Sequence, residues 1–289
     1  MAKAVVQRPT EQEHAQRRRA DRERLRDAAE ELLSPEGWMR WVQARATLRG
    51  YSAANCMLLA QQCHERGILP QRVRGLYAWR KSGRRVRKGE TALRISAPVA
   101  FRQRDEDGAD TGERRVFFKT SFVFELSQTE LLPGDQQQTL APPCEPMNDS
   151  SHERLLAPLQ AFAESLGYAV SFEAISGSSR GWCDTERRQI AIDDQVPANA
   201  QVRTLIHECV HALGVDYERY PRDRAEVIAD TITFVVSASV GLAVDAESIP
   251  FVASWGKDGA LAAVTECART IDTIARRIEA EALGSVRPG

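Results

Sequence analysis

The sequence lacks the cysteine patterns that hold small zinc-binding and secreted domains together. Its six cysteines stand at positions 56, 63, 144, 183, 209 and 267, and no two are spaced as C-x-x-C. Thiolate zinc sites and disulfide frameworks need cysteines paired at short or regular spacings. The sequence therefore predicts neither, and Cys56 and Cys63, seven residues apart in one expected helix, are interpreted as small core hydrophobes.

Long apolar runs are also absent. No stretch approaches the roughly 20 apolar residues that a membrane-spanning helix needs, and residues 1–27 are too charged for the apolar segment of a secretory signal. We expect a protein of the reducing cytoplasm with no membrane partner. A chain of 289 residues is long enough for two domains of ordinary size.

Histidine is scarce, with five in the chain, and two of them stand in the run His207-Glu208-Cys209-Val210-His211. Residues four apart share one face of a helix, so both imidazoles could bind one Zn²⁺ while Glu208 leans over the same pocket as a general base. The surrounding apolar residues have helical spacing, and Gly214 stands where a C-terminal cap is expected. The run predicts a hydrolytic zinc site, and two helical histidines beside a solvated glutamate are the alternative.

A third protein ligand must come from elsewhere in the chain, leaving one position for water. One zincin pattern continues with a third histidine, but Tyr217 stands there and no histidine follows His211. Glu226 and Asp230 share a face at the start of a later apolar helix. Glu226 could ligate the metal while Asp230 accepts the outward N–H of a ligating histidine.

Two other interpretations of these acids stay open. Glu226 and Asp230 could be solvated acids in a first helical turn, where acidic residues are common. Nearer carboxylates also compete, although they fall in a loop around Pro221 and loops hold ligands less firmly than helices. These competitors are Asp216, Glu218 and Asp223.

The segment before the histidine helix predicts a β-hairpin over residues 180–192, with a turn at 184–187. A strand beside the metal helix would offer an edge on which an extended peptide could lie. Trp182 could line that substrate cleft, or it could be a core aromatic.

Charge divides the chain into two unequal halves. Residues 1–130 carry 26 Lys and Arg against 17 Asp and Glu, whereas residues 131–289 carry 13 against 23. A polar, proline-bearing stretch at 132–151 separates them and has linker character. We expect a charged N-terminal extension at 1–20, one domain at 21–131 and a second at 152–289.

The basic half contains eight Lys and Arg between Arg72 and Lys88, with no acidic residue until Glu90. Aromatic residues are interleaved with them and recur in the strands that follow. Cationic groups give affinity for phosphates and rings stack on bases, which suits single-stranded DNA; a solvated basic turn is the alternative. The expected DNA contacts are Trp79, Arg80, Lys81, Arg84, Arg85, Arg87 and Lys88.

Periodicity predicts an α+β fold. Helices are expected at 21–48, with a break near Ser34, and at 53–65, followed by an antiparallel pair of strands at 91–102 and 114–126. In the second half a helix at 155–167 and a strand at 168–172 precede the hairpin. The histidine helix, the Glu226 helix and a closing helix at 259–283 complete a minimal zincin arrangement.

Several blocks of residues resemble ArdC-type antirestriction proteins of mobile elements. They include Tyr51-Ser52-Ala53-Ala54-Asn55, the run from Gly83 to Glu90 (GRRVRKGE), Gly181-Trp182-Cys183-Asp184 and the HExxH run. The resemblance implies a domain that binds single-stranded DNA, then a zincin-like metallopeptidase domain related to the ImmA/IrrE zincins. It also implies protection of incoming DNA from host restriction. Asp230 stands where a glutamate is common in the family.

Three functions are compatible with these patterns. In the first, a zinc endopeptidase acts on an unknown protein or peptide while tethered to DNA. In the second, binding of single strands is the activity and the metal only holds its domain in shape. In the third, the protein cleaves a repressor, as the ImmA/IrrE zincins are thought to do.

Overall fold

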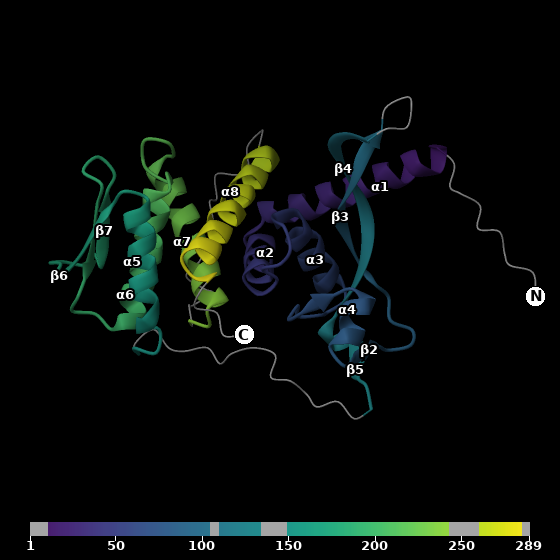
Figure 1. Cartoon of the computed structure of the whole chain (residues 1–289), viewed down its shortest axis with the longest axis horizontal. Coiled ribbons are helices and arrows are strands. Elements are labelled where there is room, and N and C mark those ends of the chain that lie inside the picture. Colours follow the sequence, from purple (N-terminus) through teal and green to yellow (C-terminus); the bar gives the residue numbers. More distant parts are fainter. Residues whose placement is uncertain (1–10, 105–109, 134–148, 243–259, 285–289) are drawn as a thin grey trace, which may run out of the picture.

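A computed structural model describes residues 11–104, 110–133, 149–242 and 260–284 (Figure 1). Its N-terminal helices are α1 (Glu11–Glu30), α2 (Pro35–Thr47) and α3 (Ala53–Glu65), with the 3-10 turn η1 (Glu31–Leu33) after α1. The expected break near Ser34 is confirmed and has a local cause. The Ser34 hydroxyl accepts a hydrogen bond from the Gly37 N–H at 3.1 Å, and Pro35 occupies the first turn of α2.

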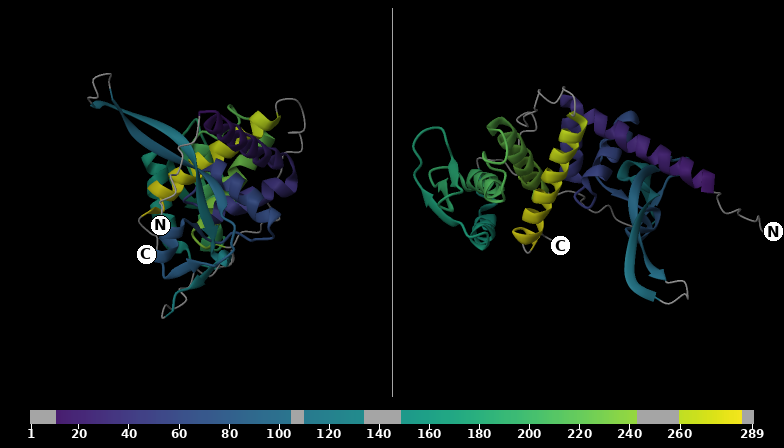
Figure 2. Two further views of the ribbon diagram at one scale, coloured as in Figure 1. Left: turned by 90° about the vertical axis from the view of Figure 1, so that its right-hand side faces the viewer. Right: turned by 90° about the horizontal axis from the view of Figure 1, so that it is seen from above.

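The first strands form a long antiparallel hairpin. β3 (Leu93–Arg104) pairs with β4 (Asp110–Glu125), with Leu93 opposite Val123, and the short β1 (Val73–Arg74) joins the outer edge of β4. Leu93, Ile95 and Val123 are buried near the base of the hairpin. Its other end projects from the helices (Figure 2). α4 (Leu76–Lys81) and β2 (Arg84–Val86) lie between β1 and β3 in the chain, whereas η2 (Leu126–Gln128) and β5 (Thr129–Leu131) follow β4. β2 pairs with β5.

The C-terminal half begins with η3 (Glu153–Leu155) and α5 (Leu156–Ser165), followed by a three-stranded sheet. The sheet has the order β6 (Ala169–Glu173), β8 (Gln189–Asp193), β7 (Gly181–Asp184), so β7 lies at an edge. β6 runs parallel to β8, and β7 and β8 form the expected hairpin. Three helices complete the fold: α6 (Ala198–Ala212), α7 (Arg222–Ser239) and α8 (Ala260–Glu281).

The α+β class is confirmed, and the elements follow one another along the long axis of the molecule (Figure 1). The small sheet lies at one end, then α5 and α6, α7 and α8, α2 and α3, and finally the β3–β4 hairpin. α7 contacts α6, α8 and α2, so the two halves of the sequence pack directly against each other. The proposed domain boundary stays a prediction, since most of the expected linker lies outside the described residues. No helix among the described residues is long and apolar enough to cross a bilayer.

A buried ion cluster joins α2 to α8. The Arg45 side chain on α2 is fully buried, with Nε 2.5 Å from Asp272 Oδ1 and Nη2 3.3 Å from Glu279 Oε2. Asp272 also accepts the Ala53 N–H at the start of α3 and a hydrogen bond from Arg276 at 3.0 Å each. A buried guanidinium needs such partners, because an unpaired charge in the interior is costly.

Replacing Arg45 with methionine is therefore expected to destabilise the protein by roughly 3–5 kcal/mol, since Asp272 and Glu279 stay buried after they lose the cation that they share. Urea unfolding followed by circular dichroism would measure the change. Arg269→Met removes an exposed ion pair with Glu266 on the same helix and should leave the midpoint nearly unchanged. Equal midpoints for the Arg45 variant and wild type would contradict the role given to this cluster.

Candidate metal centre

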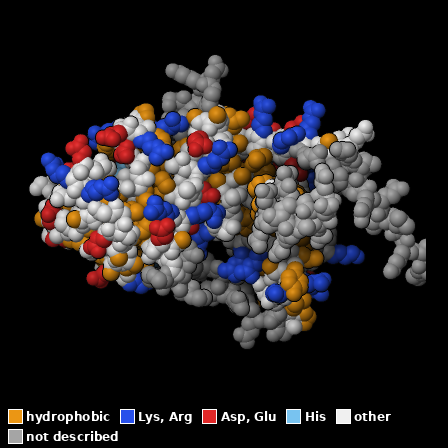
Figure 3. All heavy atoms as spheres, turned by 45° about the horizontal axis from the view of Figure 1, so that its top comes forward, with side chains coloured by type: hydrophobic (Ala, Val, Ile, Leu, Met, Phe, Trp, Pro, Cys, Tyr) orange, Lys and Arg blue, Asp and Glu red, His pale blue; other side chains and the backbone are white. Residues whose placement is uncertain are grey.

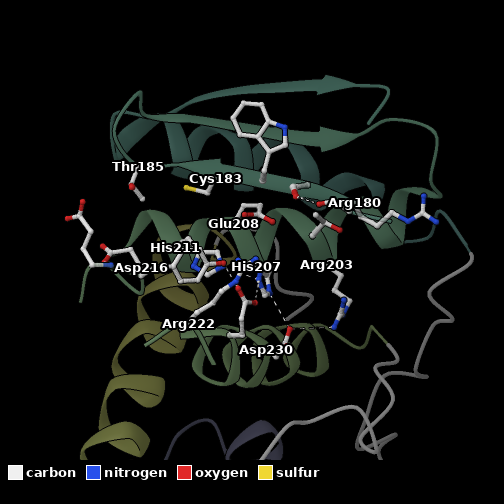
Figure 4. Close-up of a pocket in the computed structure, with 17 residues that line it drawn as sticks. Arg180, Cys183, Thr185, Arg203, His207, Glu208, His211, Asp216, Arg222 and Asp230 are labelled. Carbon is white, nitrogen blue, oxygen red and sulfur yellow. Dashed lines mark hydrogen bonds and ion pairs between the residues drawn. The ribbon is translucent and has the colours of Figure 1, made fainter. Parts of the chain in front are cut away.

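Two histidines on α6 face each other at the centre of the C-terminal half. His207 and His211 are one helical turn apart, and their Nε2 atoms are 3.1 Å from each other. The other nitrogen of each ring is engaged. His211 Nδ1 lies 2.6 Å from the Val215 carbonyl, and His207 Nδ1 lies 3.3 Å from Asp230 Oδ1 (Figure 4). If each Nδ1 carries the proton that it donates, both Nε2 lone pairs face the same point.

Glu226 on α7 brings a carboxylate to this point. Its Oε2 is 3.5 Å from His207 Nε2, and one ligand atom from each of His207, His211 and Glu226 lies within 4.8 Å of the other two. Two imidazole nitrogens and one carboxylate oxygen suit a divalent transition metal. Two unprotonated Nε2 atoms would repel each other at 3.1 Å, so this geometry needs a proton or a metal cation between the two rings. The residues therefore fit a divalent metal ion.

The charge states of these groups follow from their partners. A hydrogen bond from His207 holds the pKa of Glu226 down at about 2, against the opposing effect of burial. Burial alone would lower the pKa of His207, but its hydrogen bonds to Asp230 and Glu226 raise it to about 9. Burial lowers the pKa of His211. Binding of a metal must accordingly displace a proton from His207.

Tyr217 is a part of the site that the sequence analysis missed. It lies in the loop between α6 and α7, where a third zincin histidine would stand, and its hydroxyl donates to Oε1 of Glu226. Burial and this hydrogen bond raise the pKa of Tyr217 to about 12, so the phenol keeps its proton. The Arg222 guanidinium lies 5.2 Å above the tyrosine ring. No periodicity signals this contact, because it depends on how the loop returns to α7.

Glu208 lies on the strand side of α6, between the histidines and the sheet (Figure 4). Its side chain is buried, and burial raises its pKa to about 7. The close approach of β7 depends on Gly181, since a Cβ added there would be 2.5 Å from Cγ2 of Thr204 and 3.3 Å from Oε1 of Glu208. Glycine at this position lets the edge strand lie directly against the helix that carries the histidines.

A cleft of about 570 Å³ opens over these residues. Trp182 on the edge strand β7 lines it and is 40 % exposed, so its alternative placement in the core is wrong. Asp216 and Glu218, the competing acids, line the same cleft, but Asp216 Oδ1 accepts the backbone N–H groups of Glu218 and Arg219. Among the described residues, the acid that groups with the two histidines is Glu226, and Asp223 is not in that set.

The structure places several of the predicted DNA-contact residues where they are buried or already have partners. Trp79 is 1 % exposed and donates its indole N–H to the Phe124 carbonyl at 2.9 Å, so its prediction as a stacking ring is wrong. Three arginines of the segment have neutralising or hydrogen-bonding partners: Arg84 with the Thr129 hydroxyl at 2.8 Å, Arg85 with Glu130 at 2.7 Å and Arg87 with Glu90 at 2.8 Å. Arg80, Lys81 and Lys88 are exposed, and a DNA role for the segment stays a prediction.

These observations define an α+β protein in which a basic N-terminal half packs on a half that carries a candidate divalent-metal centre. Residues 29–124 match the family of the N-terminal domain of anti-restriction factor ArdC. The metal-free crystal structure of the antirestriction ArdC protein from plasmid R388 has a TM-score of 0.50 and 20 % identity, covering 81 % of this chain and 86 % of that one. Residues 29–124 therefore belong to the ArdC N-terminal domain family, and over most of its length the chain shares the fold of the R388 protein.

A second crystal structure of the R388 protein, in its Mn(II)-bound form, has a TM-score of 0.42 and 21 % identity, covering 80 % of this chain and 86 % of that one. No curated protein matches the chain.

Tyr217→Phe is expected to weaken binding of Zn²⁺ or Mn²⁺ about tenfold, because Glu226 loses the donor that orients its carboxylate. Isothermal titration calorimetry with each metal alone would measure the affinity. Tyr220→Phe removes a hydroxyl from the same loop and serves as the matched control. Unchanged affinity in the Tyr217 variant would show that the hydroxyl does not position the carboxylate.

Gly181→Ala is expected to destabilise the fold by about 1–3 kcal/mol, because the new methyl group would overlap with Thr204. Thermal unfolding compares it with Gly50→Ala, where an added Cβ meets nothing within 4 Å. If both variants unfold like wild type, β7 does not need a glycine at this contact.

Proposed function

We propose that this ArdC-type protein hydrolyses peptide bonds at the centre formed by His207, His211 and Glu226 and binds single-stranded DNA with its N-terminal half. In this role it is a cytoplasmic antirestriction protein that protects incoming mobile-element DNA. The observation that carries the peptidase part is the convergence of both Nε2 atoms and the Glu226 carboxylate, with the buried carboxylate of Glu208 beside them.

The donor set favours zinc, because two imidazoles, one carboxylate and an open position are typical of catalytic zinc. Manganese is the second candidate, since the R388 ArdC protein has an Mn(II)-bound crystal structure. When bound, such an ion supplies a water of lowered pKa and polarises a carbonyl oxygen.

The side chains of the chain supply the remaining chemistry. Glu208 can accept the proton of the attacking water at its carboxylate and pass it to the leaving amine. Its pKa of about 7 in the absence of a cation is already near neutrality, and a nearby positive charge would lower it and keep the carboxylate ionised. Asp230 holds His207, and Tyr217 holds Glu226, so the ligands keep their orientation through the reaction.

A peptide substrate has a place to bind beside this centre. The outer edge of β7 has no strand partner among the described residues, so its free backbone groups can pair with an extended chain. Trp182 on that strand offers an apolar surface to a substrate side chain. The cleft is also lined by Arg180, Arg203 and Arg222 and by the acids Asp216 and Glu218, so charged side chains of both signs border the place where a peptide would lie.

A metal that only stabilises the fold is the weaker candidate. Structural zinc sites in proteins are usually closed by four protein ligands. Here three described side chains converge, and the centre opens into a cleft. The accessible fourth position favours a catalytic ion.

The DNA-binding part is supported by the N-terminal domain match and by charge. On the face drawn in Figure 3, basic side chains predominate among the coloured residues of the N-terminal half, whereas acidic and basic side chains are interspersed over the C-terminal half. Positive charge concentrated in one half attracts a polyanion and leaves the other half free to meet a protein substrate.

Glu208→Gln is expected to keep the metal and to lower cleavage at least 100-fold, because the amide cannot accept the proton from water. Casein with Zn²⁺ or Mn²⁺, in the presence and absence of single-stranded DNA, provides the assay, with metal content measured by elemental analysis. Glu218→Gln changes a carboxylate of the same cleft that has no assigned proton transfer, and it should cleave like wild type. Undiminished cleavage by the Glu208 variant would overturn the assignment of the base.

A further inference from the structure

A groove of about 320 Å³ lies between α1 and the β3–β4 hairpin, away from the basic segment 79–88. Arg22, Leu25, Arg94, Phe118 and Lys119 contribute to its lining. We infer that single-stranded DNA binds along this groove, with one base on Phe118, which lines it, and another on Phe122, which lies beside it on β4, and with its phosphates on Arg22, Arg94 and Lys119. The inference rests on the proposed function and names the surface that performs its DNA-binding part.

The aromatic side chains of the hairpin are unusually exposed. Phe118 is 67 % exposed and Phe122 is 58 % exposed. The two rings lie four residues apart on β4 and therefore point to the same face of the strand. Phe101 and Phe117, each 46 % exposed, stand against one another on the opposite face. Large rings left in water along a projecting hairpin indicate a binding surface, since folding alone would bury them.

Three cations lie around the rings. Arg94 lies directly opposite Phe122 in the strand register and shares its face. Lys119 follows Phe118 and therefore alternates to the other face of β4, but it also contributes to the lining of the groove. Arg22 approaches from α1. All three cations are exposed, and none forms an ion pair with a described residue.

Asp21, the one acid among the described residues that line the groove, already has partners. Asp21 binds Arg24 through Oδ1 at 2.8 Å and accepts a hydrogen bond from the Thr120 hydroxyl through Oδ2 at 2.6 Å. The hydrogen bond to Thr120, which lies between the two phenylalanines on β4, ties α1 to the hairpin and fixes the width of the groove. The Asp21 carboxylate also neutralises Arg24. Arg22, Arg94 and Lys119 are therefore the cations that can contact phosphates.

The segment 79–88 offers less to a nucleic acid. Its tryptophan is buried, and Arg85 and Arg87 already pair with carboxylates. The exposed ring that precedes the segment, Tyr77, already has the Lys81 ammonium over its face, 4.9 Å from the ring centroid. Free rings beside free cations are what a single strand needs, and in the described structure the groove combines both. An apolar protein partner would gain nothing from the three cations.

Fluorescence anisotropy with a labelled oligo-dT tests the inference on the full chain. Phe118→Ala and Phe122→Ala should each weaken binding about tenfold at an unchanged salt slope, because stacking carries no charge. The triple variant Arg22→Ser, Arg94→Ser, Lys119→Ser should weaken binding and reduce the slope of log affinity against log salt by about 2, since each phosphate contact on a single strand contributes about 0.7. Phe118→Trp keeps a ring and should keep the affinity within about twofold.

Two matched variants probe the competing segment: Tyr77→Ala, and the triple change Arg80→Ser, Lys81→Ser, Lys88→Ser. Each should change affinity less than twofold. If they weaken binding while the groove variants bind like wild type, the inference is overturned and the proposed function stands. If wild type binds no oligonucleotide, both are overturned. Loss of self-association in the phenylalanine variants, with DNA binding intact, would assign the face to a second copy of the chain and also overturn the inference.

Discussion

The outward hydrogen bonds of two imidazoles set the chemistry of the C-terminal half. A helix places His207 and His211 on one face, but spacing does not decide which nitrogen of each ring points inward. The Val215 carbonyl and the Asp230 carboxylate take the Nδ1 positions, so Nε2 of both rings faces the same point. Without these two partners either ring could rotate, and the lone pairs would not converge on one ion.

The Val215 contact shows how the end of α6 contributes to this orientation. Gly214 has a φ of 91° and lets the chain turn back immediately after the helix. That turn brings the carbonyl of the next residue to the ring of His211. A residue with a side chain would adopt this backbone conformation only with strain, so the cap that ends the helix also fixes the orientation of a ligand.

α7 links the metal centre to the rest of the molecule. Its first turns carry Glu226 and Asp230, while its apolar residues are buried against α6, α8 and α2. α8 is in turn held to α2 by the buried Arg45 cluster. The position of the Glu226 carboxylate relative to the histidines therefore depends on packing with the N-terminal half. The contact between α7 and α2 therefore matters for the metal centre, although the two halves of the chain differ in charge.

The sequence predicted the parts of the site that lie on regular helices, because periodicity reports which residues share a face. His207, His211, Glu226 and Asp230 meet as their spacings indicated. Tyr217 was missed because it lies in a loop, whose path is set by packing that no period encodes. For Trp182 the pattern left two placements open, since an edge strand is recognised only when the strand order of the sheet is known.

Of the sequence patterns, the run of basic residues said least about the folded surface, and the reason is physical. A run of basic residues shows how many cations are present but not which carboxylates fold against them. β2 pairs with β5, and this pairing brings Glu130 to Arg85. Arg94, Lys119 and Arg22 come from separate parts of the sequence, and no run of residues reveals that they line one groove. A nucleic-acid surface depends on charges left unpaired after folding, so it has to be located from the folded structure.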